Sequence, residues 1–108
     1  MKPEFENIPL VNNEEKKRFE LEYNGQVAFI NYGDFGNQVA LVHTEAPKEL
    51  QGTGAAQALV EKTLAYIDSE GRKVLPYCPY VFAYIKRHPE WKHIVDERFS
   101  GFDQLLNS

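Results

Sequence analysis

The hydrophobic pattern of this chain changes from a period of two to a helical period at the segment Gln51-Gly52-Thr53-Gly54-Ala55-Ala56. Before this segment apolar residues alternate with polar ones, which is typical of strands with one buried face. After it they recur every three or four positions, as in an amphipathic helix. The segment itself places two glycines and two alanines where the helix should begin. Strands followed by a helix at this segment favour a mixed fold of the α+β class.

Residues 18–44 predict three antiparallel strands. Phe19, Leu21 and Tyr23 alternate with glutamates, and Asn24-Gly25 separates this run from a second one at residues 27–32. Asn-Gly between two such runs is the strongest short hairpin signal, because a type I′ turn needs positive φ at both central residues. Residues 33–37 predict a second turn, which leads into a third strand at residues 38–44. Residues 1–17 have little periodicity and predict an extended or partly ordered arm.

The second half of the chain predicts two helices around one strand. Gly71 is well placed just beyond the end of the first helix, whose apolar face consists of Ala56, Leu59, Val60, Thr63, Leu64 and Ile67. Residues 72–77 predict a short strand, and Pro79 suits the first turn of a second helix that Pro89 ends. We therefore expect one α+β domain at residues 18–96, with helices packed on a mixed sheet, and a weakly patterned tail at residues 97–108.

Composition and charge exclude several classes of protein. The 108 residues fit one domain, and a formal net charge of −4 argues against a broad nucleic-acid interface, which needs a basic face. No stretch approaches the roughly 20 apolar residues of a membrane span, and the charged first residues are unlike a signal peptide. We therefore expect a cytoplasmic protein without a membrane partner. The single cysteine, Cys78, excludes an intramolecular disulfide, and the histidines have no metal-ligand spacing, so no metal site is expected.

The segment at residues 51–56 allows two interpretations. A helix N-terminus leaves backbone N–H groups unpaired and carries a partial positive charge, and an anion such as a pyrophosphate satisfies both. The small residues Gly52, Gly54, Ala55 and Ala56 would let phosphates approach the backbone. The same residues also suit a tight turn with close packing of a helix on a sheet. The segment matches neither a Walker loop nor the dinucleotide-binding fingerprint.

Four motifs in a fixed order favour the anion-binding interpretation. They are His43-Thr44-Glu45, the segment at residues 51–56, Pro76-Tyr77-Cys78-Pro79 and Arg87-His88-Pro89-Glu90-Trp91. With the order of the elements, they resemble the GNAT N-acetyltransferase superfamily, in particular its very small single-domain members. The resemblance covers nearly the whole chain. It implies a mainly antiparallel sheet with a splayed parallel pair and flanking helices, and acetyl-CoA as cosubstrate.

The resemblance implies one of two functions. The first is transfer of the acetyl group to an unidentified amine acceptor, and the second is a non-enzymatic acyl-CoA-binding or regulatory module. Thr53 stands where larger members often have a basic residue, which leaves phosphate binding mainly to backbone N–H groups. Asn24-Gly25 leaves no room for the helices that help form the acceptor groove in larger members, so we expect an open acceptor side. We expect a monomer, or a weak homodimer formed through an exposed strand edge.

The resemblance also implies where the cosubstrate would bind. Acetyl-CoA would lie between the strand at residues 38–44 and the strand at residues 72–77. N–H groups near Val42 and His43 would bind the pantetheine or the thioester carbonyl. The pyrophosphate would meet backbone groups of Gln51, Gly52, Thr53, Gly54, Ala55 and Ala56.

Three side chains are the catalytic candidates: Cys78, His43 and Glu45. Cys78 lies between a strand end and a helix start. It is an acetyl-accepting nucleophile, a group that contacts the thioester, or a small buried filler. His43 and Glu45 share one face of a strand, with Thr44 on the other, and either could accept the proton of the amine. A surface role for both is the alternative.

Other polar residues have weaker assignments. Tyr77, Tyr80 and Tyr84 are candidates for the cleft or its rim, where one phenol could protonate the departing thiolate, and packing is the alternative for each. We expect His88 to be structural. Four cations could form a basic patch near the adenine-phosphate end or simply a solvated face: Arg72, Lys73, Lys86 and Arg87.

Overall fold

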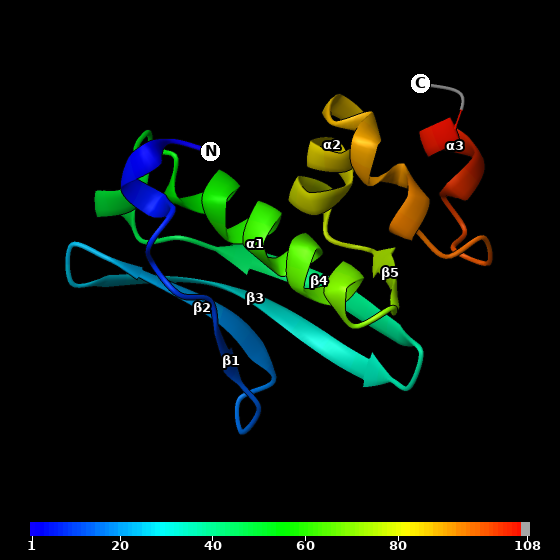
Figure 1. Cartoon of the computed structure of the whole chain (residues 1–108), viewed down its shortest axis with the longest axis horizontal. Helices are drawn as coiled ribbons and strands as arrows, with labels where there is room; N and C mark the ends of the chain where they lie inside the picture. Colours follow the sequence, from blue (N-terminus) through cyan, green and yellow to red (C-terminus); the bar gives the residue numbers. More distant parts are fainter. Residues whose placement is uncertain (107–108) are drawn as a thin grey trace.

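A five-stranded mixed sheet forms the centre of the protein (Figure 1). The computed structural model describes residues 1–106. The spatial order of the strands is β1-β2-β3-β4-β5, in which the first four are antiparallel and β4 and β5 are parallel. The bounds are β1 Val11–Asn13, β2 Arg18–Tyr23, β3 Gln26–Phe35, β4 Gln38–Glu45 and β5 Lys73–Pro76. This architecture confirms the predicted α+β class, with a mostly antiparallel sheet and one parallel pair.

The predicted hairpin between β2 and β3 is confirmed. Asn24 and Gly25 both have positive φ, at 53° and 77°, as a type I′ turn requires. The second predicted turn, at residues 33–37, is wrong in length because residues 33–35 continue β3 and pair with β4. Gly36, with φ of 71°, makes the reversal in a much shorter turn.

The two predicted helices are confirmed, and further helical segments accompany them. The long helices are α1 (Ala55–Ser69) and α2 (Pro79–Arg87), with Pro79 in the first turn as expected. Gly71, with φ of 69°, follows α1, and the N–H of Arg72 donates to the carbonyl of Ile67. The remaining segments are η1 (Pro3–Phe5), η2 (Lys48–Leu50), η3 (Pro89–Ile94) and α3 (Phe102–Leu106). No helix within residues 1–106 is long and apolar enough to cross a membrane.

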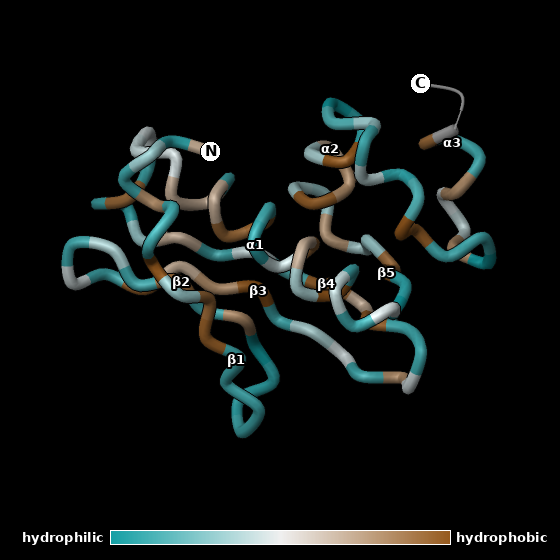
Figure 2. The backbone as a smooth tube through the Cα atoms, viewed as in Figure 1, coloured by the Kyte–Doolittle hydropathy of each residue, from teal (hydrophilic) through white to brown (hydrophobic). Residues whose placement is uncertain are grey.

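One core fills the space between the sheet and its helices. α1 lies across one face of the sheet, where Phe19 of β2 contacts Tyr66 at 5.7 Å between ring centroids. α2 lies beside α1 and contacts β4 and β5. Figure 2 shows hydrophobic residues within β2 and β3 and hydrophilic residues at the turns that connect the strands. Fully buried side chains come from every layer, among them Phe5, Leu21, Ile30, Leu41, Leu59, Leu64, Ile67 and Ile85.

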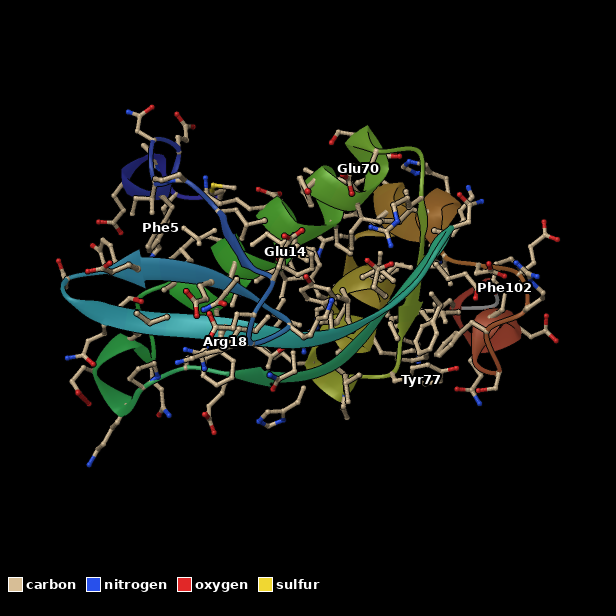
Figure 3. The ribbon with its side chains drawn as sticks, turned by 90° about the horizontal axis from the view of Figure 1, so that it is seen from below. Phe5, Glu14, Arg18, Glu70, Tyr77 and Phe102 are labelled. Carbon is tan, nitrogen blue, oxygen red and sulfur yellow. The ribbon has the colours of Figure 1, made fainter. Side chains whose placement is uncertain are left out.

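The residues before and after the expected domain are also part of the packed structure. Residues 1–17, predicted as an extended or partly ordered arm, contain η1 and β1. β1 pairs with β2, which would have been an edge strand of the three antiparallel strands predicted at residues 18–44. Phe5 is fully buried and packs on Tyr23, on the α1 side of the sheet (Figure 3). The predicted tail at residues 97–108 contains the buried residues Phe99 and Leu105. Its last two positions, 107 and 108, lie outside the described residues.

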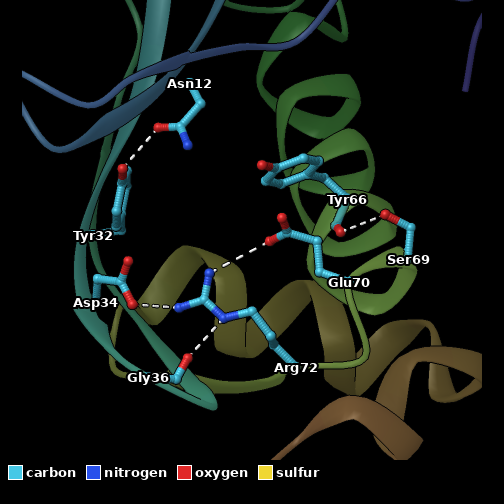
Figure 4. A network of polar contacts seen from close by, with 8 residues as sticks. All are labelled: Asn12, Tyr32, Asp34, Gly36, Tyr66, Ser69, Glu70 and Arg72. Atoms are coloured by element: carbon cyan, nitrogen blue, oxygen red, sulfur yellow. Dashed lines mark hydrogen bonds and ion pairs between the residues drawn. The ribbon is translucent and has the colours of Figure 1, made fainter.

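Arg72 holds the turn between β3 and β4 against the end of α1 (Figure 4). Its guanidinium donates to the carbonyl of Gly36 at 2.8 Å and forms ion pairs with Asp34 and Glu70. The N–H of Lys73 also donates to the carbonyl of Asn37 at 2.8 Å. These contacts hold β4 and β5 together where their pairing begins, so any separation of the two strands has to occur at the other end.

Candidate functional site

β4 and β5 separate after four paired residues, next to a β-bulge in β4. Leu41 pairs with Tyr32 and His43 pairs with Asn31, so Val42 is the extra residue without a partner on β3. The pairing of β4 with β5 ends at Leu41 and Pro76, while β4 continues to Glu45. Within the described residues, the β5-side edge of residues 42–45 therefore has no strand beside it. We call the place where β4 and β5 part the opening.

The bulge also determines which side chains of β4 face α1. Residues paired across antiparallel strands point to the same face of a sheet. Thr44 pairs with the buried Ile30 and therefore faces α1, whereas His43 pairs with Asn31 and faces the other side. Arg18 pairs with Asn31 as well, and Figure 3 shows it on the face opposite Phe5. We call this face, which includes Asn31, His43 and Glu45, the outer face.

Cys78 lies at the opening and contacts β4. Its N–H donates to the carbonyl of Leu41 at 2.8 Å, directly beyond the last paired residues of β4 and β5. Its Sγ lies 3.2 Å from Oγ1 of Thr44, and its side chain is buried at 3% exposure. Cys78 is the N-cap residue of α2. The thiol thus lies between the end of β5, the start of α2 and the separated part of β4.

His43 and Glu45 lie together on the outer face, as the alternation of the strand predicted. Nε2 of His43 is 3.8 Å from Oε1 of Glu45, and both side chains are more than half exposed. They do not contact Cys78, which meets Thr44 on the α1 side instead. The three catalytic candidates are therefore divided between the two faces of β4.

The loop before α1 has the backbone conformation that its glycines suggest. Gly52 and Gly54 have φ of 80° and 92°, in the left-handed region that favours glycine. The hydroxyl of Thr53 accepts a hydrogen bond from the N–H of Ala55 at 3.1 Å. No acceptor within residues 1–106 bonds to the N–H groups of Gly54, Ala56 or Gln57, and the first turn of α1 has no acidic side chain. These donors are consequently available to an external anion.

A hollow of about 380 Å³ lies against this loop. Four of the predicted binding residues line it, namely Gln51, Gly52, Gly54 and Ala56. Ala55 is fully buried and packs into the core, and Val42 and His43 are exposed on β4 outside this hollow. Five further residues, which the sequence did not place here, complete the lining: Lys2, Ala46, Leu50, Gln57 and Tyr80. A lysine from the chain terminus shows no local pattern that could have indicated its place.

Gly54 makes room for the N-terminal segment. A Cβ atom built at Gly54 would lie 3.4 Å from Cε of Lys2 and 3.5 Å from a ring carbon of Phe5. A Cβ at Gly52, in contrast, would meet nothing within 4 Å. The two glycines therefore differ in role, because only Gly52 borders open space on the side where its own side chain would lie.

The three tyrosines fall into different environments. Tyr80 lines the hollow and a second, smaller one of about 90 Å³ between α1 and α2, and burial raises its pKa above the ordinary value. Tyr84 donates to Glu61 at 3.3 Å and stacks on His88, which makes it a packed residue with a bonded tip. Tyr77 lies edge-on to Phe99 at 5.3 Å, away from the hollow. Tyr80 is thus the tyrosine that borders the site.

The remaining polar predictions have mixed outcomes. His88 is structural, as expected, because its Nδ1 lies 2.9 Å from the carbonyl of Tyr84. The basic patch or solvated face of four cations stays a prediction, but Arg72 forms ion pairs with Asp34 and Glu70, and Lys73 donates to the carbonyl of His93. Of these four cations, Arg87 is the one that lines the smaller hollow between α1 and α2.

The match to a protein family agrees with this geometry. The family model of the GCN5-related N-acetyltransferases matches residues 18–94, which is most of the chain. The chain belongs to the GCN5-related N-acetyltransferase family. The matched segment includes the bulged strand β4, the glycine loop, α1, β5 and α2, and therefore all of the candidate site except Lys2.

Proposed function

We propose that this GNAT protein binds acetyl-CoA in the opening between β4 and β5. The pyrophosphate would accept hydrogen bonds from the free N–H groups of Gly54, Ala56 and Gln57, where the partial positive charge of the N-terminus of α1 also stabilises it. The pantetheine would lie along the unpaired edge of residues 42–45. Its amide groups would form hydrogen bonds with the backbone N–H and C=O groups of that edge. The observation that carries the proposal is the separation of β4 and β5 in a chain of this family, together with the glycine loop that begins α1.

We further propose direct transfer of the acetyl group to an amine. The amine nitrogen forms a bond to the thioester carbonyl carbon, the C–S bond breaks, and coenzyme A departs as the thiolate. His43, paired with Glu45 on the outer face, accepts the proton of the amine that approaches from that side. Tyr80, which borders the hollow and stays protonated at neutral pH, donates a proton to the thiolate. Cys78, next to Thr44 at the opening, contacts the thioester.

The outer face is open enough to admit several kinds of amine acceptor. Side chains of His43 and Glu45 are 61% and 62% exposed, so nothing in the described residues encloses an acceptor there. A protein lysine, an N-terminal amine or a small amine would all reach this face. An acyl-CoA-binding module without transferase activity is the second candidate, because a module needs no enclosed acceptor site. A cytoplasmic monomer or weak homodimer stays part of the proposal.

The release of free coenzyme A thiol tests the proposal. Purified protein is mixed with acetyl-CoA and, in turn, with a lysine peptide, a peptide with a free N-terminus and a polyamine. Amine-dependent release above the uncatalysed rate supports the transferase. Binding of acetyl-CoA without such release supports the module. Acetylation of Cys78 in the absence of any amine, detected by mass spectrometry, would replace direct transfer with a covalent route.

A further inference from the structure

The first residues of the chain reach the glycine loop. Nζ of Lys2 donates to the carbonyl of Thr53 at 2.9 Å, across 51 residues of sequence. Lys2 lines the same hollow as Gln51, Gly52, Gly54 and Ala56. Figure 1 shows the N-terminus and η1 beside the segment that leads into α1. Lys2 therefore borders the proposed pyrophosphate site although it lies outside the segment that the family model matches.

The position of Lys2 is determined by the core. Phe5, three residues later, is fully buried and packs on Tyr23, and its N–H donates to the carbonyl of Lys2 at 3.1 Å. The hydroxyl of Tyr23 donates to Glu4 at 2.9 Å, which holds the same segment on β2. The aliphatic stem of Lys2 passes over Gly54, where a Cβ would come within 3.5 Å of it. The packing of Phe5 thus places the backbone of Lys2 beside the loop, and the hydrogen bond to Thr53 holds the ammonium group there.

The charge of Lys2 has no counterion in the part of the chain that the structure describes. Among residues 1–106, Lys2 makes no ion pair, and its one hydrogen bond leaves two of the three donors of its ammonium group unused. It is also the single charged side chain among the described residues that line the hollow. A pyrophosphate bound to uncharged backbone donors alone would keep most of its negative charge unbalanced in a protein of net charge −4.

We infer that Lys2 binds the pyrophosphate of the acyl-CoA cosubstrate, so that the N-terminal segment forms part of the site. This inference rests on the proposed function. The ammonium group would form charge-assisted hydrogen bonds to the phosphate oxygens while the loop supplies its N–H groups. The lysine thereby adds the positive charge that Thr53 and its neighbours in the loop lack.

Calorimetric titration of four proteins with three ligands tests the inference. The proteins are the full chain with its own sequence, Lys2→Met, Lys2→Arg and Lys62→Met. Lys62 is the matched control, because its Nζ donates to the carbonyl of Glu6 in the same N-terminal segment but lies outside the hollow. The ligands are coenzyme A, ADP, which has the pyrophosphate without the pantetheine, and pantetheine, which has the reverse.

We expect Lys2→Met to weaken the binding of coenzyme A and ADP by about tenfold at low salt and less at high salt. Lys2→Arg should keep most of the affinity, Lys62→Met should equal the unchanged protein, and pantetheine should bind all four alike. Unchanged affinity of Lys2→Met for coenzyme A would overturn the inference. An equal loss in Lys62→Met, or an equal loss for pantetheine, would also overturn it by assigning the effect to the segment's packing. Failure of the unchanged protein to bind coenzyme A would instead overturn the proposed function, and the inference with it.

Discussion

Sγ of Cys78 lies 3.2 Å from Oγ1 of Thr44, although the two residues are 34 positions apart. This contact joins the start of α2 to the part of β4 that has separated from β5. It exists because the bulge at Val42 turns Thr44 toward the α1 side of the sheet, where the N–H of Cys78 is bonded to Leu41. The thiol is therefore placed at the opening by two strands and a helix together.

Replacement of Cys78 by alanine should separate binding from transfer. We expect Cys78→Ala to bind acetyl-CoA nearly as the unchanged protein does, while its rate of acetyl transfer falls at least tenfold, which corresponds to a barrier higher by about 1.4 kcal/mol or more. The thiol-release assay and a binding titration measure the two quantities. Thr44→Val, which removes the hydroxyl partner of Cys78, should lower the rate in the same direction. An unaltered rate in Cys78→Ala would remove Cys78 from the chemistry.

Gly52 and Gly36 form a matched pair for the loop. Both have φ in the left-handed region and open space where a Cβ would lie, but only Gly52 borders the hollow. We expect Gly52→Ala and Gly36→Ala to lower the free energy of unfolding by a similar amount, about 1–2 kcal/mol, in denaturant titrations. Only Gly52→Ala should also weaken the binding of coenzyme A. Equal affinities in the two variants would speak against the loop as the phosphate site.

His43 has a matched control in His93. Each is exposed and lies near a carboxylate, Glu45 for His43 and Asp68 for His93, at 3.8 Å and 3.3 Å. We expect His43→Gln to lower kcat/KM by about a hundredfold, because a general base contributes on that order, and His93→Gln to leave it unchanged. Steady-state kinetics with the best amine measure both. Similar kinetics for the two variants would show that His43 is not the base.

Asp96 should make the stability of the fold depend on pH. Hydrogen bonds from the side chain of Arg98, from Gln38 and from the backbone of Arg98 hold its pKa well below the ordinary value. Because the pKa is lower in the folded state, the stabilisation is complete above about pH 4 and is lost as the pH falls further. We expect Asp96→Asn to lower the free energy of unfolding at pH 7 by about 1–3 kcal/mol. Near pH 2 the free energies of unfolding of the variant and the unchanged protein should differ by less. Asp103→Asn, an exposed aspartate of α3, is the control in urea titrations at several pH values.

Much of the fold could be predicted from local pattern. Asn24-Gly25 indicated the first hairpin because the two positions of its turn need positive φ. Gly71 indicated the end of α1 and Pro79 the start of α2, because their backbone preferences suit those positions. The turn at residues 33–37 was predicted too long because its glycine and aspartate are typical of turns, but Gly33 and Asp34 pair with β4 instead. At these two residues the pairing of β3 with β4 outweighs the local preference for a turn.

The site was only partly predictable, since its residues meet through tertiary contacts. The loop at residues 51–56 and the pair His43 and Glu45 follow from spacing along one element. The contact of Thr44 with Cys78 depends on a one-residue bulge, which alternation along a strand does not reveal. Lys2 reaches the loop only because Phe5 packs into the core, and a short segment without periodicity gives no sign of that.

A titration of the isotopically labelled protein with acetyl-CoA, followed by NMR of the backbone amides, tests the central claim most directly. The predicted result is saturable binding, with the largest shifts at the amides of residues 51–57 and of residues 42–44 on β4. Both segments should respond together, because one ligand spans the loop and the free edge of β4. The absence of any shift at millimolar acetyl-CoA, or shifts confined to other parts of the protein, would contradict it.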